Sequence, residues 1–154
     1  MRGITAQQQL IQWLEQARAN LLSSIDGLTD EQASRQEIDG WSVKDHLTHL
    51  TAWDEMRFFE ISRIVRGGGP SMKETLEEDL GAINEPFARA RRHMSLSQVL
   101  ADLQFVHEMI KQAVTSAPEE CLDENLYGEI DMVGAAHEAG HAGIIRTWRE
   151  QAGL

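Results

Sequence analysis

Two histidines near the end of the chain, His137 and His141, have the spacing of a metal-binding pair. Residues four apart on an α-helix lie about 40° apart around its axis, so both imidazoles project from one face at neighbouring turns. This geometry suits one divalent ion. The pair shares its helical face with Val133, Ile144 and Trp148, which predicts imidazoles that point toward the protein interior. Buried imidazoles need polar partners, and either separate hydrogen bonds or one shared metal ion would meet that need.

The residues from His137 to His141 read His-Glu-Ala-Gly-His, which also matches the HExxH pattern of zinc proteases. A protease is disfavoured, because no histidine follows His141 and the extended protease pattern is absent. Glu138 would be the general base of such an enzyme. It directly follows His137 and therefore points about 100° away around the helix, which predicts a carboxylate that faces solvent.

A third metal ligand must come from another helix. His46 and His49 lie three residues apart on a second predicted helix, and either could face its interior side. We favour His49, because Leu50 and Trp53 flank it, whereas His46 lies nearer the polar start of the helix. His107 is a further candidate, as a fourth ligand or a supporting group, although a lone histidine in a core is more often a hydrogen-bonded packing residue.

Helical periodicity dominates the chain and defines the elements that must position these histidines. Thr5, Ser42 and Ser95 are predicted N-caps, and the glycine run that ends in Pro70 is predicted to stop a helix. The apolar stripes recur at steps of three and four: Leu10, Leu14, Ala17, Leu21 and Ile25; Val43, Leu47, Leu50, Ile61 and Ile64; Val99, Leu103, Val106, Ile110 and Val114. These patterns predict an all-α four-helix bundle with short additional helical segments, in a single domain over residues 1–154.

Two segments are harder to assign. Met72, Leu76, Leu80, Ile83 and Phe87 are spaced helically, but Pro86 interrupts them, so either Asn84 caps a fresh helix or the segment bends there. Residues 119–130 are acidic and are predicted to be irregular. The last helix is predicted to begin near Asp131 and to run through Trp148.

Composition narrows the classes of function. The 154 residues are 42% hydrophobic and 25% charged, which is typical of a globular protein. A formal net charge of −11 argues against nucleic acids and anionic membranes as partners. The single cysteine, Cys121, rules out an intramolecular disulfide and lies among carboxylates that disfavour a reactive thiolate. With neither a signal peptide nor an apolar run of ~18 residues, we expect a cytoplasmic protein.

The segment Gly-Trp-Ser-Val-Lys-Asp-His-Leu-Thr-His-Leu-Thr-Ala-Trp, residues 40–53, resembles the signature of the DinB-like superfamily. Residues 81–126 and the histidines of the last helix are similar to its ClbS/DfsB-type branch. The resemblance implies a four-helix bundle with a divalent metal held by three histidines. Carried onto this chain, these are His49, eight residues after Trp41, together with His137 and His141. Some relatives, including members of the ClbS-type branch, lack the triad.

Characterised relatives include transferases and isomerases that use low-molecular-weight thiols, and the ClbS branch includes proteins that act on a reactive genotoxic metabolite. The resemblance therefore implies a metal-dependent thiol transferase or hydrolase for a small reactive organic compound, with zinc, nickel, manganese or iron as the ion. The alternative is a non-enzymatic binding protein that sequesters a small molecule, with a structural metal or none. A homodimer is a further expectation. The residues assign no general base, and Asp45 suits either a hydrogen bond to His49 or a helix start.

Overall fold

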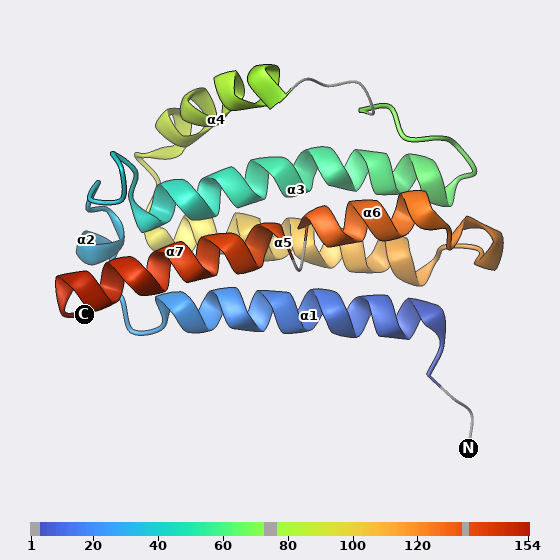
Figure 1. Cartoon of the computed structure of the whole chain (residues 1–154), viewed down its shortest axis with the longest axis horizontal. Helices are drawn as coiled ribbons and strands as arrows, with labels where there is room; N and C mark the ends of the chain where they lie inside the picture. The colour runs from blue at the N-terminus through green and yellow to red at the C-terminus, as the bar shows by residue number, and fades with distance from the viewer. Residues whose placement is uncertain (1–3, 73–76, 134–135) are drawn as a thin grey trace.

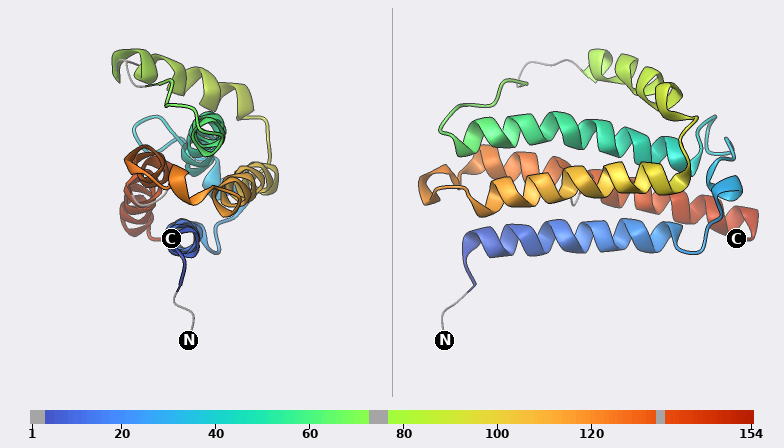
Figure 2. Two further views of the ribbon diagram at one scale, coloured as in Figure 1. Left: turned by 90° about the vertical axis from the view of Figure 1, so that its right-hand side faces the viewer. Right: turned by 180° about the vertical axis from the view of Figure 1, so that it is seen from behind.

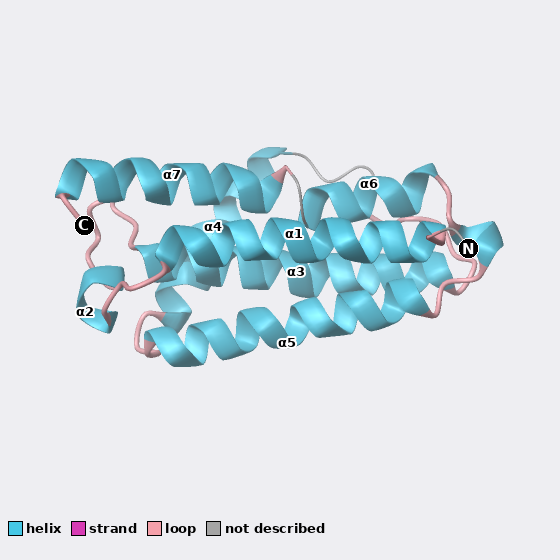
Figure 3. Ribbon diagram, turned by 90° about the horizontal axis from the view of Figure 1, so that it is seen from below, coloured by secondary structure: helices cyan, strands magenta, loops and turns pink. Residues whose placement is uncertain are grey.

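The protein is a bundle of helices with one helix lying outside it. The structure is a computed structural model that describes residues 4–72, 77–133 and 136–154, and these residues contain no strand. The bundle is formed by α1 (Ala6–Ile25), α3 (Val43–Val65), α5 (Leu96–Thr115), α6 (Glu124–Val133) and α7 (His137–Ala152). The last two lie end to end and together fill the fourth position (Figures 1, 2 and 3). The predicted all-α fold is confirmed.

The helices α1, α3 and α5 start at the predicted caps. The side chains of Thr5, Ser42 and Ser95 each accept a hydrogen bond from a backbone N–H three residues later, and each belongs to a reciprocal capping box. A fourth box at Thr29 starts the one-turn helix α2 (Asp30–Ala33). At its other end, α3 stops at Val65 and the chain turns through Gly67, whose φ of +85° favours glycine.

The predicted boundaries near the C-terminus are wrong. Residues 119–130, which we expected to be irregular, contain a 3₁₀ turn (Glu119–Cys121) and most of α6. The Asp123 carboxylate accepts hydrogen bonds from the backbone N–H groups of Asn125 and Leu126, which gives α6 its start. Leu126 and Ile130, four residues apart, give it a buried face. The last helix begins at His137 rather than near Asp131, since Asp131 lies in α6, which ends at Val133. Residues 134–135 lie outside the described part of the chain.

The helix outside the bundle, α4 (Glu77–Arg91), packs along α3 (Figure 1). It contains Pro86 without a fresh start, so the alternative in which Asn84 caps a new helix is wrong. The Asn84 Oδ1 atom instead accepts a hydrogen bond of 2.9 Å from Trp53 Nε1 on α3. Of the predicted apolar series, Met72 precedes α4, Leu76 lies outside the described residues and so does the side chain of Leu80.

The three predicted apolar stripes are buried, and they form two separate clusters along the bundle. One cluster holds Leu14, Ile61, Ile110 and Ile130; the other holds Leu21, Leu50, Leu103 and Ile145. Along α1, α3 and α5, and from α6 to α7, the change from one cluster to the other occurs near a buried polar residue. These residues are Arg18, Asp54, His107 and Glu138, in that order of helices. A polar layer therefore crosses the middle of the core.

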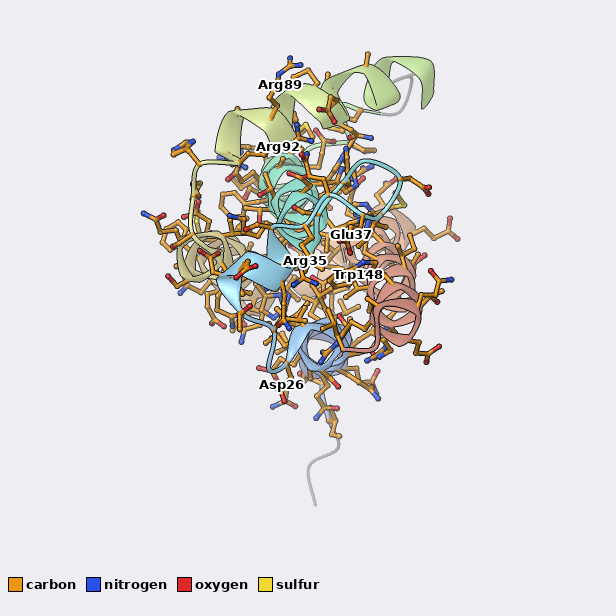
Figure 4. All side chains as sticks on the ribbon, turned by 90° about the vertical axis from the view of Figure 1, so that its left-hand side faces the viewer. Asp26, Arg35, Glu37, Arg89, Arg92 and Trp148 are labelled. Atoms are coloured by element: carbon orange, nitrogen blue, oxygen red, sulfur yellow. The ribbon has the colours of Figure 1, made fainter. Side chains whose placement is uncertain are left out.

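One end of the bundle is closed by the connection between α2 and α3. The indole N–H of Trp148 on α7 donates to the Glu37 carboxylate in this connection, and Figure 4 shows the two side chains together at this end. Arg149 donates to the carbonyl oxygens of Ser24, in the last turn of α1, and of Asp26, its C-cap. Trp148 is thus a packing residue of the core rather than part of the histidine site. No described helix has both the length and the apolar character needed to cross a membrane.

Two neighbouring leucines of α1 allow the core assignment to be tested. Leu21 is fully buried, whereas 38% of Leu22 is exposed. We expect Leu21→Ala to lower the free energy of unfolding by about 2–5 kcal/mol, because it leaves a cavity between packed helices. The matched control Leu22→Ala should cost less than about 1 kcal/mol. Urea unfolding followed by circular dichroism measures both values, and equal losses would contradict the packing described for α1.

Candidate metal centre

Four imidazoles from two helices gather on one side of the bundle. His46 and His49 lie on α3, and His137 and His141 lie in the first two turns of α7. One ring nitrogen from each of His49, His137 and His141 lies within 4.8 Å of the corresponding nitrogens of the other two. The closest pair, His49 Nε2 and His137 Nε2, is separated by 2.9 Å. The structure therefore brings together the three histidines chosen from the sequence.

The helical register of α7 differs from the sequence prediction. Ile144, which we placed on the interior face with His137 and His141, is 45% exposed, whereas Ala142 and Ile145 are buried. The two imidazoles are only half-buried, so they lie at the edge of the core rather than in its centre. This location leaves His137 on the wall of an adjacent cavity.

All three imidazoles are neutral at physiological pH, which is the form that binds a metal. Burial lowers the pKa of His49 to about 4, with a further contribution from the neighbouring His137. Burial and the charge of Arg57 lower the pKa of His137 to about 4. Burial and the other histidines of the cluster lower the pKa of His141 to about 2.

The donor set fits a divalent ion. Imidazole nitrogens bind zinc at about 2.0–2.1 Å in tetrahedral sites, so two such ligands lie roughly 3.3 Å apart. His49 Nε2 and His137 Nε2 lie slightly closer, at a hydrogen-bond distance of 2.9 Å. The proton of this hydrogen bond therefore lies between the two nitrogens, where an ion bound by both imidazoles would also lie. These two nitrogens need to separate by only a few tenths of an ångström to share it.

His46 joins the cluster, although the sequence favoured His49 over it. Its Nδ1 atom lies 2.7 Å from His141 Nδ1, while its Nε2 atom is buried without a partner among the described residues. His46 does not belong to the group whose nitrogens lie within 4.8 Å of one another. One of the two Nδ1 atoms must carry a proton and donate it to the other. His46 is therefore placed to bind His141 rather than a shared ion.

The start of α3 positions both of its histidines. Asp45 Oδ2 accepts a hydrogen bond from the Ser42 backbone N–H, and Arg92 Nε donates to the same carboxylate. These bonds match the helix-start role for Asp45 rather than a bond to His49. Trp41, just before the helix, packs against both imidazoles of α3, with ring centroids 5.2 Å and 5.4 Å away. The first two turns of α3 are thus held from both sides.

A cavity of about 260 Å³ lies against the histidine cluster. Its walls include His49 and His137, and its remaining lining comes from three elements: Trp53 and Arg57 on α3, Asn84 on α4 and Met132 on α6. A molecule in this cavity would contact two of the three candidate ligands. Trp53 is buried and forms part of this wall.

Glu138 corrects a prediction. We expected a carboxylate that faces solvent, but Glu138 is 1% exposed and pairs with Arg18, which is 3% exposed. The Arg18 Nη2 atom lies 2.6 Å from Glu138 Oε1 and 3.2 Å from Asp54 Oδ2, and Arg18 Nη1 donates to the Leu103 carbonyl oxygen. One guanidinium thus joins α1, α3, α5 and α7. Because the ion pair occupies Glu138, this carboxylate is not a free general base.

The polar layer contains two carboxyl groups, those of Asp54 and Glu138, and one guanidinium, that of Arg18. Burial and the nearby Glu138 carboxylate raise the pKa of Asp54 well above its ordinary value, although Arg18 opposes the shift. Burial also raises the pKa of Glu138. The layer therefore favours a protonated Asp54, because that state balances one carboxylate against one guanidinium.

His107 lies in this polar layer, not in the metal cluster. It is buried, and burial together with the charge of Arg18 lowers its pKa to about 4. It does not belong to the group of three histidines found among the described residues. The structure therefore does not support its candidacy as a fourth ligand.

The fold and site together define a helical bundle whose histidine cluster can hold a divalent metal. The sequence profile of the DinB superfamily matches residues 14–145. Because this match spans most of the chain, the protein belongs to the DinB superfamily. Among solved structures, an uncharacterised protein from Escherichia coli UTI89 is similar, with 19% sequence identity, a TM-score of 0.81 and coverage of 96% of this chain and 95% of that one. That likeness concerns the fold alone. A comparison with curated proteins gives no match.

The buried ion pair leads to a prediction about stability. We expect Arg18→Met to lower the free energy of unfolding by about 3–5 kcal/mol, because Glu138 would lose its partner inside the core. The double variant Arg18→Met with Glu138→Gln should lose less, since no unpaired charge remains. Urea unfolding of both variants measures the difference. A double variant as unstable as Arg18→Met alone would show that the loss comes from packing rather than from charge.

Proposed function

We propose that this protein is a metal-dependent enzyme acting on small, reactive organic molecules, with a divalent ion held by His49, His137 and His141. The observation that carries the proposal is the convergence of three neutral imidazoles from two helices, two of which, His49 and His137, line a cavity. Three protein ligands leave coordination positions open, as in catalytic rather than closed structural zinc sites. Imidazole ligands are compatible with zinc, nickel, manganese and iron.

The reaction we propose is the transfer of a low-molecular-weight thiol to an electrophile, or the hydrolysis of that electrophile. A divalent ion in this site supplies a nucleophile near neutral pH, because it lowers the pKa of a coordinated thiol or water. Around it, Trp41 and Trp53 pack against the His49 imidazole. The resemblance of residues 81–126 to the ClbS/DfsB-type branch supports a reactive small molecule as substrate.

The first experiment measures metal content and turnover together. We expect untagged protein to contain about one divalent ion per chain. His49→Ala, His137→Ala and His141→Ala should each lose that ion while circular dichroism shows that the helices persist. The matched control is His93→Ala, because His93 is exposed and does not belong to the three-histidine group.

Mass spectrometry of a model electrophile, recovered after incubation with metal-loaded protein and a thiol, then identifies the reaction. A thiol adduct indicates a transferase, and an added water indicates a hydrolase. An electrophile that is protected but recovered unchanged indicates the sequestering protein that was the alternative from the sequence. Protein that takes up none of the four metals would contradict the proposed function.

The role of His46 gives a second test of the centre. If His141 binds the ion through Nε2, its Nδ1–H donates to His46 Nδ1 and holds the ring in place. We expect His46→Leu to weaken metal affinity about 10–100-fold, as the loss of such supporting groups does elsewhere. His46→Asn, which keeps an acceptor near the same position, should restore most of that affinity. Competition with a chelating indicator measures each dissociation constant, and equal affinities for both variants would exclude this role.

A further inference from the structure

The cavity beside the histidine cluster is lined by side chains with N–H groups that donate no hydrogen bond within the described structure. Its volume of about 260 Å³ is below the roughly 300–1,000 Å³ of pockets for drug-sized ligands, so its occupant is smaller. Trp53 and Met132 supply apolar wall, whereas Arg57 and Asn84 supply N–H groups. This combination selects a short molecule with an acceptor group at the end away from the imidazoles.

Arg57 is held in a fixed orientation by its neighbours. Its Nη1 atom donates to both carboxylate oxygens of Glu129, at 2.9 Å and 3.2 Å, and its guanidinium carbon lies 5.8 Å from the centre of the Trp53 ring. Within the described part of the chain, these bonds engage only one of the three guanidinium nitrogens. Arg57 lines the same cavity as His49 and His137. Arg57 therefore presents its remaining N–H groups close to the candidate metal ligands.

Asn84 supplies a second donor to the lining of the cavity. Its Oδ1 atom accepts the indole N–H of Trp53, and this bond sets the orientation of the amide. The Nδ2 group is then the part of the amide that remains for a ligand. Asn84 and Arg57 come from different helices, α4 and α3, and both line the same cavity as His49 and His137.

The charges around the cavity favour an anion. Glu129 pairs with Arg57, so a divalent ion held by the imidazoles would leave the site with a net positive charge. Carboxylates accept two parallel hydrogen bonds from a guanidinium, and such charge-assisted bonds are stronger than neutral ones. We propose that Arg57 and Asn84 bind the carboxylate of a small substrate or co-substrate whose other end reaches the metal centre. This inference rests on the proposed metal function.

Three thiols of similar size but different charge test the inference: 3-mercaptopropionate, 2-mercaptoethanol and cysteamine. Thiolates bind cobalt, and their absorption reports occupancy of a cobalt-loaded centre without any turnover. We expect 3-mercaptopropionate to bind about 10–100-fold more tightly than 2-mercaptoethanol, as a charge-assisted pair provides. Arg57→Met should abolish most of that preference and leave the affinity for 2-mercaptoethanol unchanged.

Two matched variants separate recognition from general effects. Arg66→Met removes the arginine at the C-terminal cap of α3, which does not line this cavity, and should keep the preference. Glu129→Gln removes the carboxylate that competes for Arg57 and should strengthen binding of 3-mercaptopropionate. A preference that survives Arg57→Met would show that the probe chelates the ion by itself, and this result would overturn the inference while leaving the metal function intact.

Failure of the metal function is distinguishable from failure of this inference. If the protein takes up no cobalt, the proposed function fails, and propionate titration of the metal-free protein tests the carboxylate site directly. The indole N–H of Trp53, which is bonded to Asn84, then serves as the nuclear magnetic resonance probe. A shift of this signal that is absent from Arg57→Met would support the carboxylate site, and no shift in either protein would overturn it.

Discussion

One buried guanidinium connects all four positions of the bundle. Arg18 of α1 donates to Glu138 of α7, to Asp54 of α3 and to the Leu103 carbonyl oxygen of α5. Moving such a charge out of water costs several kcal/mol, so it is tolerated in a core only when its N–H groups are satisfied. The requirement couples the helices, because no one of them can shift without leaving a buried polar group unpaired. It also divides the apolar core into its two clusters.

The need to satisfy the hydrogen bonds of Arg18 also affects the histidine cluster, because Glu138 and His137 are adjacent residues of α7. Glu138 directly follows His137, and consecutive residues project about 100° apart around a helix. When Arg18 holds Glu138 inside the core, His137 is turned toward α3, where His49 Nε2 lies 2.9 Å from its own Nε2. Because α7 begins at His137, its first turn supplies both Glu138 to the polar layer and His137 to the cluster. The stability of the core and the geometry of the cluster are therefore linked.

Local patterns made most of the helices predictable, whereas register and charge burial depended on tertiary packing. The caps at Thr5, Ser42 and Ser95 and the apolar stripes act over a few residues, so the sequence displays them. The face of α7 was ambiguous because Ile144 and Ile145 are adjacent and apolar, and only packing against α1 selects Ile145. The burial of Arg18 had a signal: it lies four residues after Leu14 and three before Leu21, on the apolar stripe itself. A charged residue at a core position is a sign of a buried partner.

The cluster is supported differently on its two sides, and this asymmetry determines how a ligand would approach. Trp41 packs against His46 and His49, and His46 in turn contacts His141, so this side consists of aromatic rings in contact with one another. On the other side, His49 and His137 border the cavity with its N–H donors. A reacting molecule can therefore reach the imidazole nitrogens through the cavity, where its polar end meets donors and its apolar part meets Trp53. Selectivity in such a site comes from the lining of the approach as much as from the histidines.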